Sequence, residues 1–92
     1  MLWTVTYSRK ASKQQQRLPA RVKAVLDALI LEIKQLGPVR GTWPNYSKLG
    51  DDQHHCHLKK GQPTFVAVWQ VTDRAIRIVE VIYVGTHEKA PY

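Results

Sequence analysis

The sequence predicts a single α+β domain in which two helices cover one face of a small sheet. A short alternating stretch opens the chain, an apolar stripe at helical spacing follows, and the second half contains three β-rich segments joined by turns. Helices that precede a run of hairpin-linked strands are typical of a two-layer α+β fold. The 92 residues suffice for one domain, 1–92, and leave no room for a second.

The first two elements are expected to be a strand and a polar helix. Residues 3–7 alternate between large apolar side chains and threonines, which indicates a strand with one buried face. Ser8 is a good N-cap residue, and the segment Arg9–Arg17 that follows is rich in helix-forming glutamine and basic residues. This first helix has little apolar surface to bury.

The second helix has the clearest periodicity in the chain. Pro19 suits its first turn, where a missing N–H does no harm, and Gly37–Pro38 is expected to end it. Apolar residues recur at the spacing of one helical face, which predicts that this face packs on the core. They are Val22, Val25, Leu26, Leu29, Ile30, Ile33 and Leu36.

An antiparallel meander is expected after an irregular connection over residues 38–52. Its strands are predicted at Gln53–Lys60, Phe65–Val71 and Ile76–Val84. Thr72–Asp73–Arg74 is expected to form the second hairpin turn, and Gly85 to end the last strand. The last strand is β-branched on both faces, which favours a central place in the sheet.

The charge balance favours a polyanionic partner. Fourteen Lys and Arg residues against seven Asp and Glu give a net charge of +7, and such an excess predicts salt-sensitive binding to nucleic acid. A charge that serves solubility alone is the alternative, and a membrane surface is the weaker option. One cysteine, no apolar leader segment and no long apolar run indicate a cytoplasmic protein.

Histidines and basic residues are concentrated at positions 54–60. Strand alternation places His55, His57 and Lys59 on one face and turns Cys56 toward the core as a small hydrophobe. Adjacent residues on opposite faces cannot converge on one ion, so we expect no metal site. The histidine face could supply proton transfer near neutral pH, although a merely solvated strand face explains the pattern equally well.

The end of the chain carries a second polar set. His87 is expected to emerge at a sheet edge just after the last strand, followed by Lys89 and Tyr92. A frayed tail is the alternative interpretation, because terminal residues are often poorly ordered. Phe65 is expected to serve in packing rather than as a base-stacking platform.

The order of these elements, the segment 46–49 that leads into the meander, and the ending 82–92 together resemble the RelE/ParE superfamily of bacterial toxins. The resemblance covers nearly the whole chain. It implies a RelE-like two-layer fold and, in the RelE-like branch, cleavage of mRNA in the ribosomal A site. The ParE-like branch instead poisons DNA gyrase.

The resemblance also implies a set of site residues. The basic pair of RelE-like members falls on His57 and Lys59, the Arg or His after the last strand falls on His87, and the C-terminal Tyr falls on Tyr92. These four are the expected catalytic residues. An Arg common in the family is replaced here by Val66, which leaves the phosphate contact to other groups.

Four further residues are expected to bind RNA: His55, Lys60, Arg77 and Lys89. Lys60, Arg77 or a ribosomal group is expected to compensate for the replaced Arg. The implied chemistry is cofactor-free and metal-independent: a ribose 2′-hydroxyl attacks the neighbouring phosphorus with the help of a general base, a general acid and nearby cations.

The sequence therefore favours the toxin of a type II toxin–antitoxin pair, acting as a ribosome-dependent endoribonuclease. Its expected partners are a cognate antitoxin, ribosome-bound mRNA and ribosomal RNA, with no membrane. A ParE-like gyrase inhibitor and a non-catalytic RNA-binding module remain as alternatives. The first predicts that the histidines are dispensable, and the second predicts RNA binding without a cleaved product.

Overall fold

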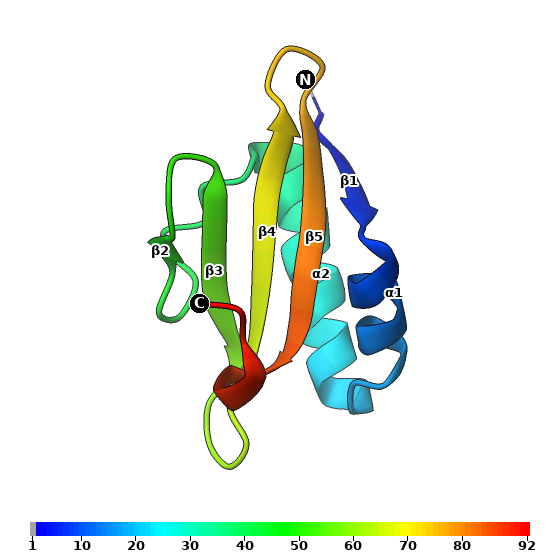
Figure 1. Ribbon diagram of the computed structural model, residues 1–92, viewed down its shortest axis with the longest axis vertical. Coiled ribbons are helices and arrows are strands. Elements are labelled where there is room, and N and C mark those ends of the chain that lie inside the picture. Colours follow the sequence, from blue (N-terminus) through cyan, green and yellow to red (C-terminus); the bar gives the residue numbers. More distant parts are fainter. Residues whose placement is uncertain (1) are drawn as a thin grey trace.

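The fold is a mixed sheet of five strands with two helices against one face, which confirms the α+β class. It is seen in a computed structural model that describes residues 2–92. The order of strands across the sheet is β1-β5-β4-β3-β2. In Figure 1, α2 lies behind the central strands and the C-terminal segment crosses in front of them.

The first and last strands of the chain are neighbours in the sheet. β1 (Thr4–Tyr7) pairs in parallel with β5 (Ile78–Thr86). All the other pairings are antiparallel, and they join β5 to β4 (Phe65–Asp73), β4 to β3 (Gln53–Lys59) and β3 to β2 (Ser47–Lys48). β5 is thus an internal strand, as its composition predicted.

The helices begin and end close to the expected positions. The Ser8 hydroxyl accepts a hydrogen bond from the amide of Ala11 at 3.1 Å and caps α1 (Arg9–Gln16). In α2 (Ala20–Leu36), Pro19 occupies the N-cap position. Gly37 ends this helix at φ +98°, a backbone conformation that glycine adopts without steric cost.

The apolar stripe of α2 forms the main core against the sheet. Val22, Leu26, Leu29 and Ile33 are fully buried, and Val25 and Ile30 are partly buried against the same cluster. The predicted place of Leu36 in this face is wrong, because this last helical residue is 66% exposed. Trp69 of β4 is the largest fully buried side chain, and its ring nitrogen donates to the carbonyl of Pro38 at 2.9 Å.

Two parts of the meander differ from the prediction. Residues 38–52 are not wholly irregular, because Ser47 and Lys48 form β2 against β3, a strand too short to show alternation. The turn between β4 and β5 falls at residues 74–77 instead of 72–74, and Ile76 is 66% exposed within it. The Asp73 carboxylate accepts a hydrogen bond from the Ile76 amide at 3.0 Å, which stabilises the later turn.

The sheet face away from the helices carries a small apolar cluster of its own. Val66, Val68 and Tyr83 are buried there, and Leu49, Ile82 and Ala90 pack against them. Ala90 belongs to the segment after β5, so the polar tail expected from the sequence folds back over the sheet (Figure 1). β5 itself continues through Gly85 to Thr86.

His54 is a buried ionisable residue within the main core. It is 1% exposed, its Nδ1 lies 2.6 Å from the hydroxyl of Tyr46, and its ring stacks on Trp69 with centroids 5.9 Å apart. Burial is the main cause that lowers the pKa of His54. Cys56 is also buried, as predicted, and burial raises the pKa of its thiol to about 12.

Gly85→Ala should destabilise the fold, because a Cβ there would lie 2.8 Å from the Tyr83 hydroxyl oxygen. That hydroxyl donates to the Thr86 carbonyl at 2.7 Å, so displacing the ring also breaks a hydrogen bond. We expect a loss of about 1–3 kcal/mol in urea unfolding. Gly41→Ala is the control, since nothing lies within 4 Å of its Cβ position. Equal stability of the two variants would contradict the close contact.

The buried His54 should make stability depend on pH. Its pKa is lowered in the folded state from an ordinary value of 6.5, so below that pH the unfolded chain binds more protons and stability falls. In His54→Gln, the free energy of unfolding should decrease less steeply as the pH is lowered. Urea unfolding at a series of pH values would measure this slope. His57, whose pKa is also lowered, stays in the variant and retains part of the slope. An unchanged slope would show that His54 is not protonated on unfolding.

Candidate functional site

Three histidines and a tyrosine from distant parts of the chain meet on the sheet face opposite the helices. We call His55, His57, His87 and Tyr92 the histidine cluster. The ring centroids of His57 and His87 are 5.5 Å apart in an edge-on arrangement. Tyr92 lies 4.5 Å from His55 and 5.9 Å from His87, also between ring centroids. All four residues were predicted as site residues, and the structure brings them together.

Strand alternation explains how β3 presents two of these rings. His55 lies opposite Val68 and His57 lies opposite Val66, both of which belong to the apolar cluster on the same face. β2 holds His55 in place: its Nδ1 is 3.1 Å from the Ser47 hydroxyl and 3.3 Å from the Ser47 carbonyl oxygen. Only 8% of His55 is exposed, so it forms the inner wall of the cluster.

The segment after β5 supplies the other two rings. His87 begins a short 3-10 helix, η1 (His87–Lys89), and its amide donates to the carbonyl of Thr64 at 2.8 Å. The amide of Ala90 donates back to the carbonyl of His87, and Ala90 packs on the sheet. These contacts turn the chain so that Tyr92 reaches His55. Tyr92 remains 47% exposed and can contact a ligand.

The surroundings of His57 favour its neutral form. Burial is the main cause that lowers the pKa of His57, and the charges of His87, His55 and Lys60 lower it further. Its Nδ1 is buried with no hydrogen-bond partner within residues 2–92. A neutral imidazole beside a second imidazole can accept a proton while its neighbour donates one. Burial likewise raises the pKa of Tyr92, which therefore stays protonated.

Lys59 does not join the cluster, although alternation placed it beside His57. The register of β3 shifts between His57 and Lys59, so Leu58 is an extra residue and Lys59 lies opposite Phe65. Phe65 packs on the helix side of the sheet, and Lys59 lines a shallow hollow there with Val22 and Val25 of α2. The prediction that Lys59 shares a face with His57 is therefore wrong.

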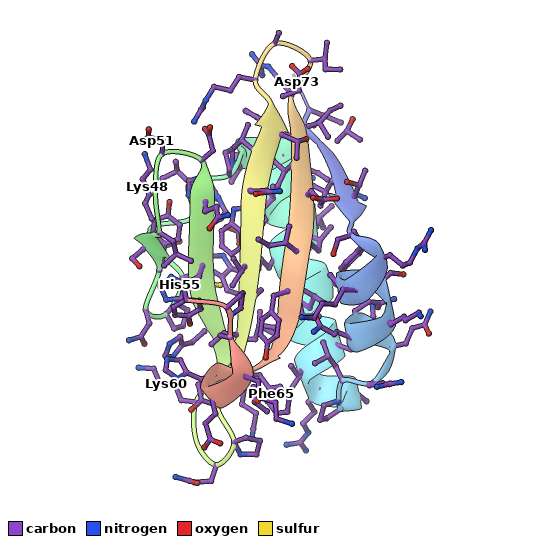
Figure 2. All side chains as sticks on the ribbon, in the orientation of Figure 1. Lys48, Asp51, His55, Lys60, Phe65 and Asp73 are labelled. Carbon is purple, nitrogen blue, oxygen red and sulfur yellow. The ribbon has the colours of Figure 1, made fainter. Side chains whose placement is uncertain are left out.

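The other basic residues are divided between the two ends of the sheet. Lys60 follows β3 and is close enough for its charge to lower the pKa of His57. Lys60 lies at the same end of the sheet as Phe65, whereas Asp73 marks the opposite end (Figure 2). Arg77 lies in the turn after Asp73, with its guanidinium 5.8 Å from the ring centre of Trp3. Arg77 is thus remote from the cluster.

Val66, which stands where the resemblance led us to expect an arginine, also has apolar surroundings in the structure. Val66 is fully buried and lies directly opposite His57, so it forms part of the floor beneath the histidines. No charge can reach a ligand from this position. Of Lys60 and Arg77, the two residues predicted to compensate, only Lys60 is among the charges that lower the pKa of His57.

Two anchoring residues were missed by the sequence interpretation. Ser47 fixes the ring of His55, and Thr64 fixes the backbone of His87. Ser47 lies in a two-residue strand and Thr64 just before β4, where neither shows a periodic pattern. The match of residues 46–49 to the family was the only sequence signal near either position.

The described residues contain neither a metal-ligand group nor a membrane-spanning helix. Across residues 2–92, no group of three or more His, Cys, Asp or Glu side chains is arranged to hold a metal ion. Within the same part of the chain, no helix is both long enough and apolar enough to cross a membrane.

His87→Gln should raise the pKa of His57 toward 6.5, because it removes one of the charges that lower it. Titration of the imidazole carbon-bound protons by NMR would measure the shift. Burial remains in the variant, so the pKa of His57 should stay below its ordinary value. Lys59→Gln is the matched control, since Lys59 is not among the charges that lower this pKa. A His57 pKa that does not respond to His87→Gln would contradict the coupling of the two rings.

Solved structures share this fold, although sequence comparisons find no match. No protein-family model matches the chain, and no curated protein sequence matches it significantly. A variant of the E. coli toxin RelE in its free state superposes with a TM-score of 0.74 at 20% identity, covering 98% of this chain and 88% of that one.

Two structures of complexes are also similar. RelE in the archaeal RelE–RelB complex from Pyrococcus horikoshii gives a TM-score of 0.69 at 12% identity, covering 98% of this chain and all of that one (100%). The intact E. coli RelBE toxin–antitoxin complex gives 0.64 at 19% identity, with coverages of 95% and 99%. Over essentially its whole length, this protein has the fold of the RelE toxins.

Proposed function

We propose that this protein is the toxin of a toxin–antitoxin pair and that it cleaves ribosome-bound mRNA without a metal ion or cofactor. The observation that carries the proposal is the pairing of His57 with His87, with Tyr92 beside them, on an exposed sheet face. The RelE-like fold and the net charge of +7 support the same conclusion. Three members of the histidine cluster, His57, His87 and Tyr92, are also residues to which the resemblance to RelE-like toxins assigns catalytic roles.

The reaction that two adjacent imidazoles support is an internal transesterification. His57, held neutral, takes the proton of a ribose 2′-hydroxyl, and the 2′-oxygen forms a bond to the adjacent phosphorus. The bond from phosphorus to the 5′-oxygen breaks, and that oxygen takes a proton from His87. The products are a 2′,3′-cyclic phosphate and a 5′-hydroxyl end. The proton lost from the nucleophile balances the one gained by the leaving oxygen.

Charge that builds on the phosphoryl oxygens requires a nearby cation. We assign this role to Lys60 in place of Lys59, because Lys60 acts electrostatically on His57 while Lys59 lies on the helix side of the sheet. Tyr92, protonated and half exposed, is suited to contact the ribose or the base next to the scissile bond. Ribosomal RNA is proposed to complete the site on this face of the sheet.

A small antitoxin is the proposed protein partner. Two of the structures with this fold are complexes of RelE with RelB and of the RelBE toxin–antitoxin pair. A partner that covers the histidine cluster or displaces the segment 87–92 would disable the site. Its surface should be acidic where it meets this basic chain.

The proposal can be tested in a reconstituted translation reaction, with mRNA ends mapped by primer extension. Cuts should fall within codons and should require ribosomes. His57→Ala and His87→Ala should each slow cleavage by about a hundred- to ten-thousand-fold, as expected for loss of a general acid or base. Lys60→Gln should slow it by about a hundredfold or more. Lys59→Gln, its matched neighbour, should have the smaller effect.

The variants must fold for this comparison to hold, so each is checked by urea unfolding. Full activity of His57→Ala and His87→Ala would overturn the mechanism. If the mRNA stays intact while the protein arrests growing cells, the result would favour inhibition of DNA gyrase, the target of the ParE-like branch. Salt-sensitive RNA binding without cleavage would indicate a non-catalytic RNA-binding module.

A further inference from the structure

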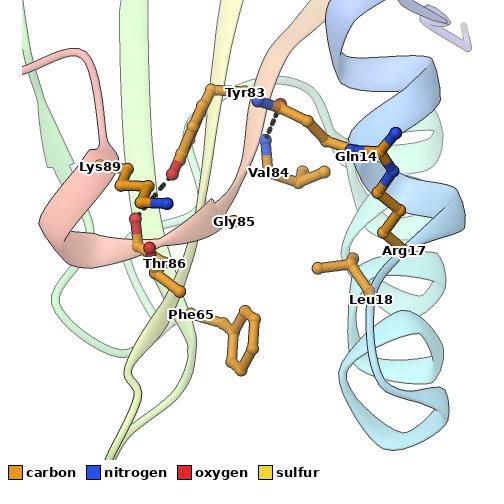
Figure 3. Close-up of a pocket in the computed structure, with 9 residues that line it drawn as sticks. All are labelled: Gln14, Arg17, Leu18, Phe65, Tyr83, Val84, Gly85, Thr86 and Lys89. Atoms are coloured by element: carbon orange, nitrogen blue, oxygen red, sulfur yellow. Dashed lines mark hydrogen bonds between the residues drawn. The ribbon is translucent and has the colours of Figure 1, made fainter.

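The second half of β5 has a free edge. β1 pairs with β5 only from Ile78 to Val81, although β5 continues to Thr86. α1 follows β1 in the chain and packs alongside this edge, which no strand pairs with. The side chain of Gln14 accepts a hydrogen bond from the Val84 amide at 3.1 Å and so satisfies a backbone donor that no strand reaches (Figure 3).

A groove of about 360 Å³ lies along this edge. Its floor is formed by Val84 and Gly85, the side chain of Leu18 borders it from the helix side, and Phe65 closes one end (Figure 3). Arg17 lines the groove from the side of α1, and Lys89 lines it from the side of η1. We call this the α1–β5 groove.

The composition of the α1–β5 groove suits a flat ring that carries a negative charge. Phe65 offers an aromatic surface on which a nucleobase can stack, and Leu18 and Val84 offer apolar contacts. Arg17 and Lys89, on opposite sides, can each contact a phosphate. No Asp or Glu lines the groove to oppose an anion.

The groove and a smaller hollow beside His87 share one residue. Thr86 lines the α1–β5 groove and also this hollow of about 140 Å³, which is lined by His87, Gly61 and the acidic Glu88. A chain lying in the groove would pass Thr86 and η1 on its way to His87. Single-stranded nucleic acid, which is extended and charged throughout, fits such a path.

We propose that the α1–β5 groove binds one nucleotide of single-stranded RNA close to the phosphate that the histidine cluster acts on. This rests on the proposed function for the identity of the strand. An added peptide strand is the less favoured occupant, because Gln14 already bonds the Val84 amide that such a strand would need. The two flanking cations and the net charge of +7 also favour a polyanion.

Binding is tested with a single-stranded oligoribonucleotide that is 2′-O-methylated throughout and therefore cannot be cleaved. Fluorescence anisotropy at several salt concentrations gives the slope of log affinity against log salt. Arg17→Gln and Lys89→Gln should each reduce this slope by about 0.7, the value for one lost phosphate contact on a single strand. Arg9→Gln, an equal charge change at an exposed α1 position that does not line the groove, should leave the slope unchanged.

NMR of the ¹⁵N-labelled protein locates the oligonucleotide independently. The amide signals of Leu18 and Val84 should shift on binding, and Arg17→Gln should weaken the shift. Shifts confined to the neighbourhood of His57 and His87, with slopes equal in all variants, would overturn the groove and leave the proposed function intact. If RNA occupies the groove but the protein cuts no mRNA, the subsite is supported and the proposed nuclease activity is wrong. Shifts at Leu18 and Val84 from an acidic peptide but not from RNA would also overturn the subsite.

Discussion

The parallel pairing of β1 with β5 organises the rest of the molecule. Parallel neighbours cannot be joined by a tight hairpin, so the chain must leave the sheet between them and return. Here the excursion contains both helices and the three other strands, which places α2 across one face. The pairing ends at Val81, and the remainder of β5 has an edge that pairs with no strand and lies beside α1. One short ladder thus determines both where the core lies and where the sheet stays open.

The two faces of the sheet serve different purposes. The face under α2 buries the large side chains, including Trp69 and Leu26, and provides the main hydrophobic stabilisation. The opposite face buries only a small cluster around Val66 and Tyr83. This cluster is large enough to hold the last residues of the chain against the sheet and small enough to leave His87 and Tyr92 exposed. Apolar packing therefore positions the polar site.

Periodicity predicted the parts of the structure that repeat. The α2 stripe apart from Leu36, the internal place of β5 and the facing of His55 and His57 all follow from alternation or helical spacing and are confirmed. The parts that depend on single contacts were missed. β2 is defined by its pairing with His54 and His55, and the late turn before β5 by one Asp73 hydrogen bond. The meeting of His87 with His57 came from family resemblance, since no local pattern encodes a contact between segments so far apart.

The bulge at Leu58 has a consequence for comparing this chain with its structural relatives. An extra residue inside a strand changes the phase of alternation, so positions after it exchange faces relative to an unbulged strand. An ungapped alignment of β3 with an unbulged strand would therefore match Lys59 to a residue on the opposite face of the sheet. Aligning the two strands by face would require a one-residue gap within the strand, a place where gaps are normally penalised. At identities of 12–20% to solved structures, few identical residues are available to position such a gap.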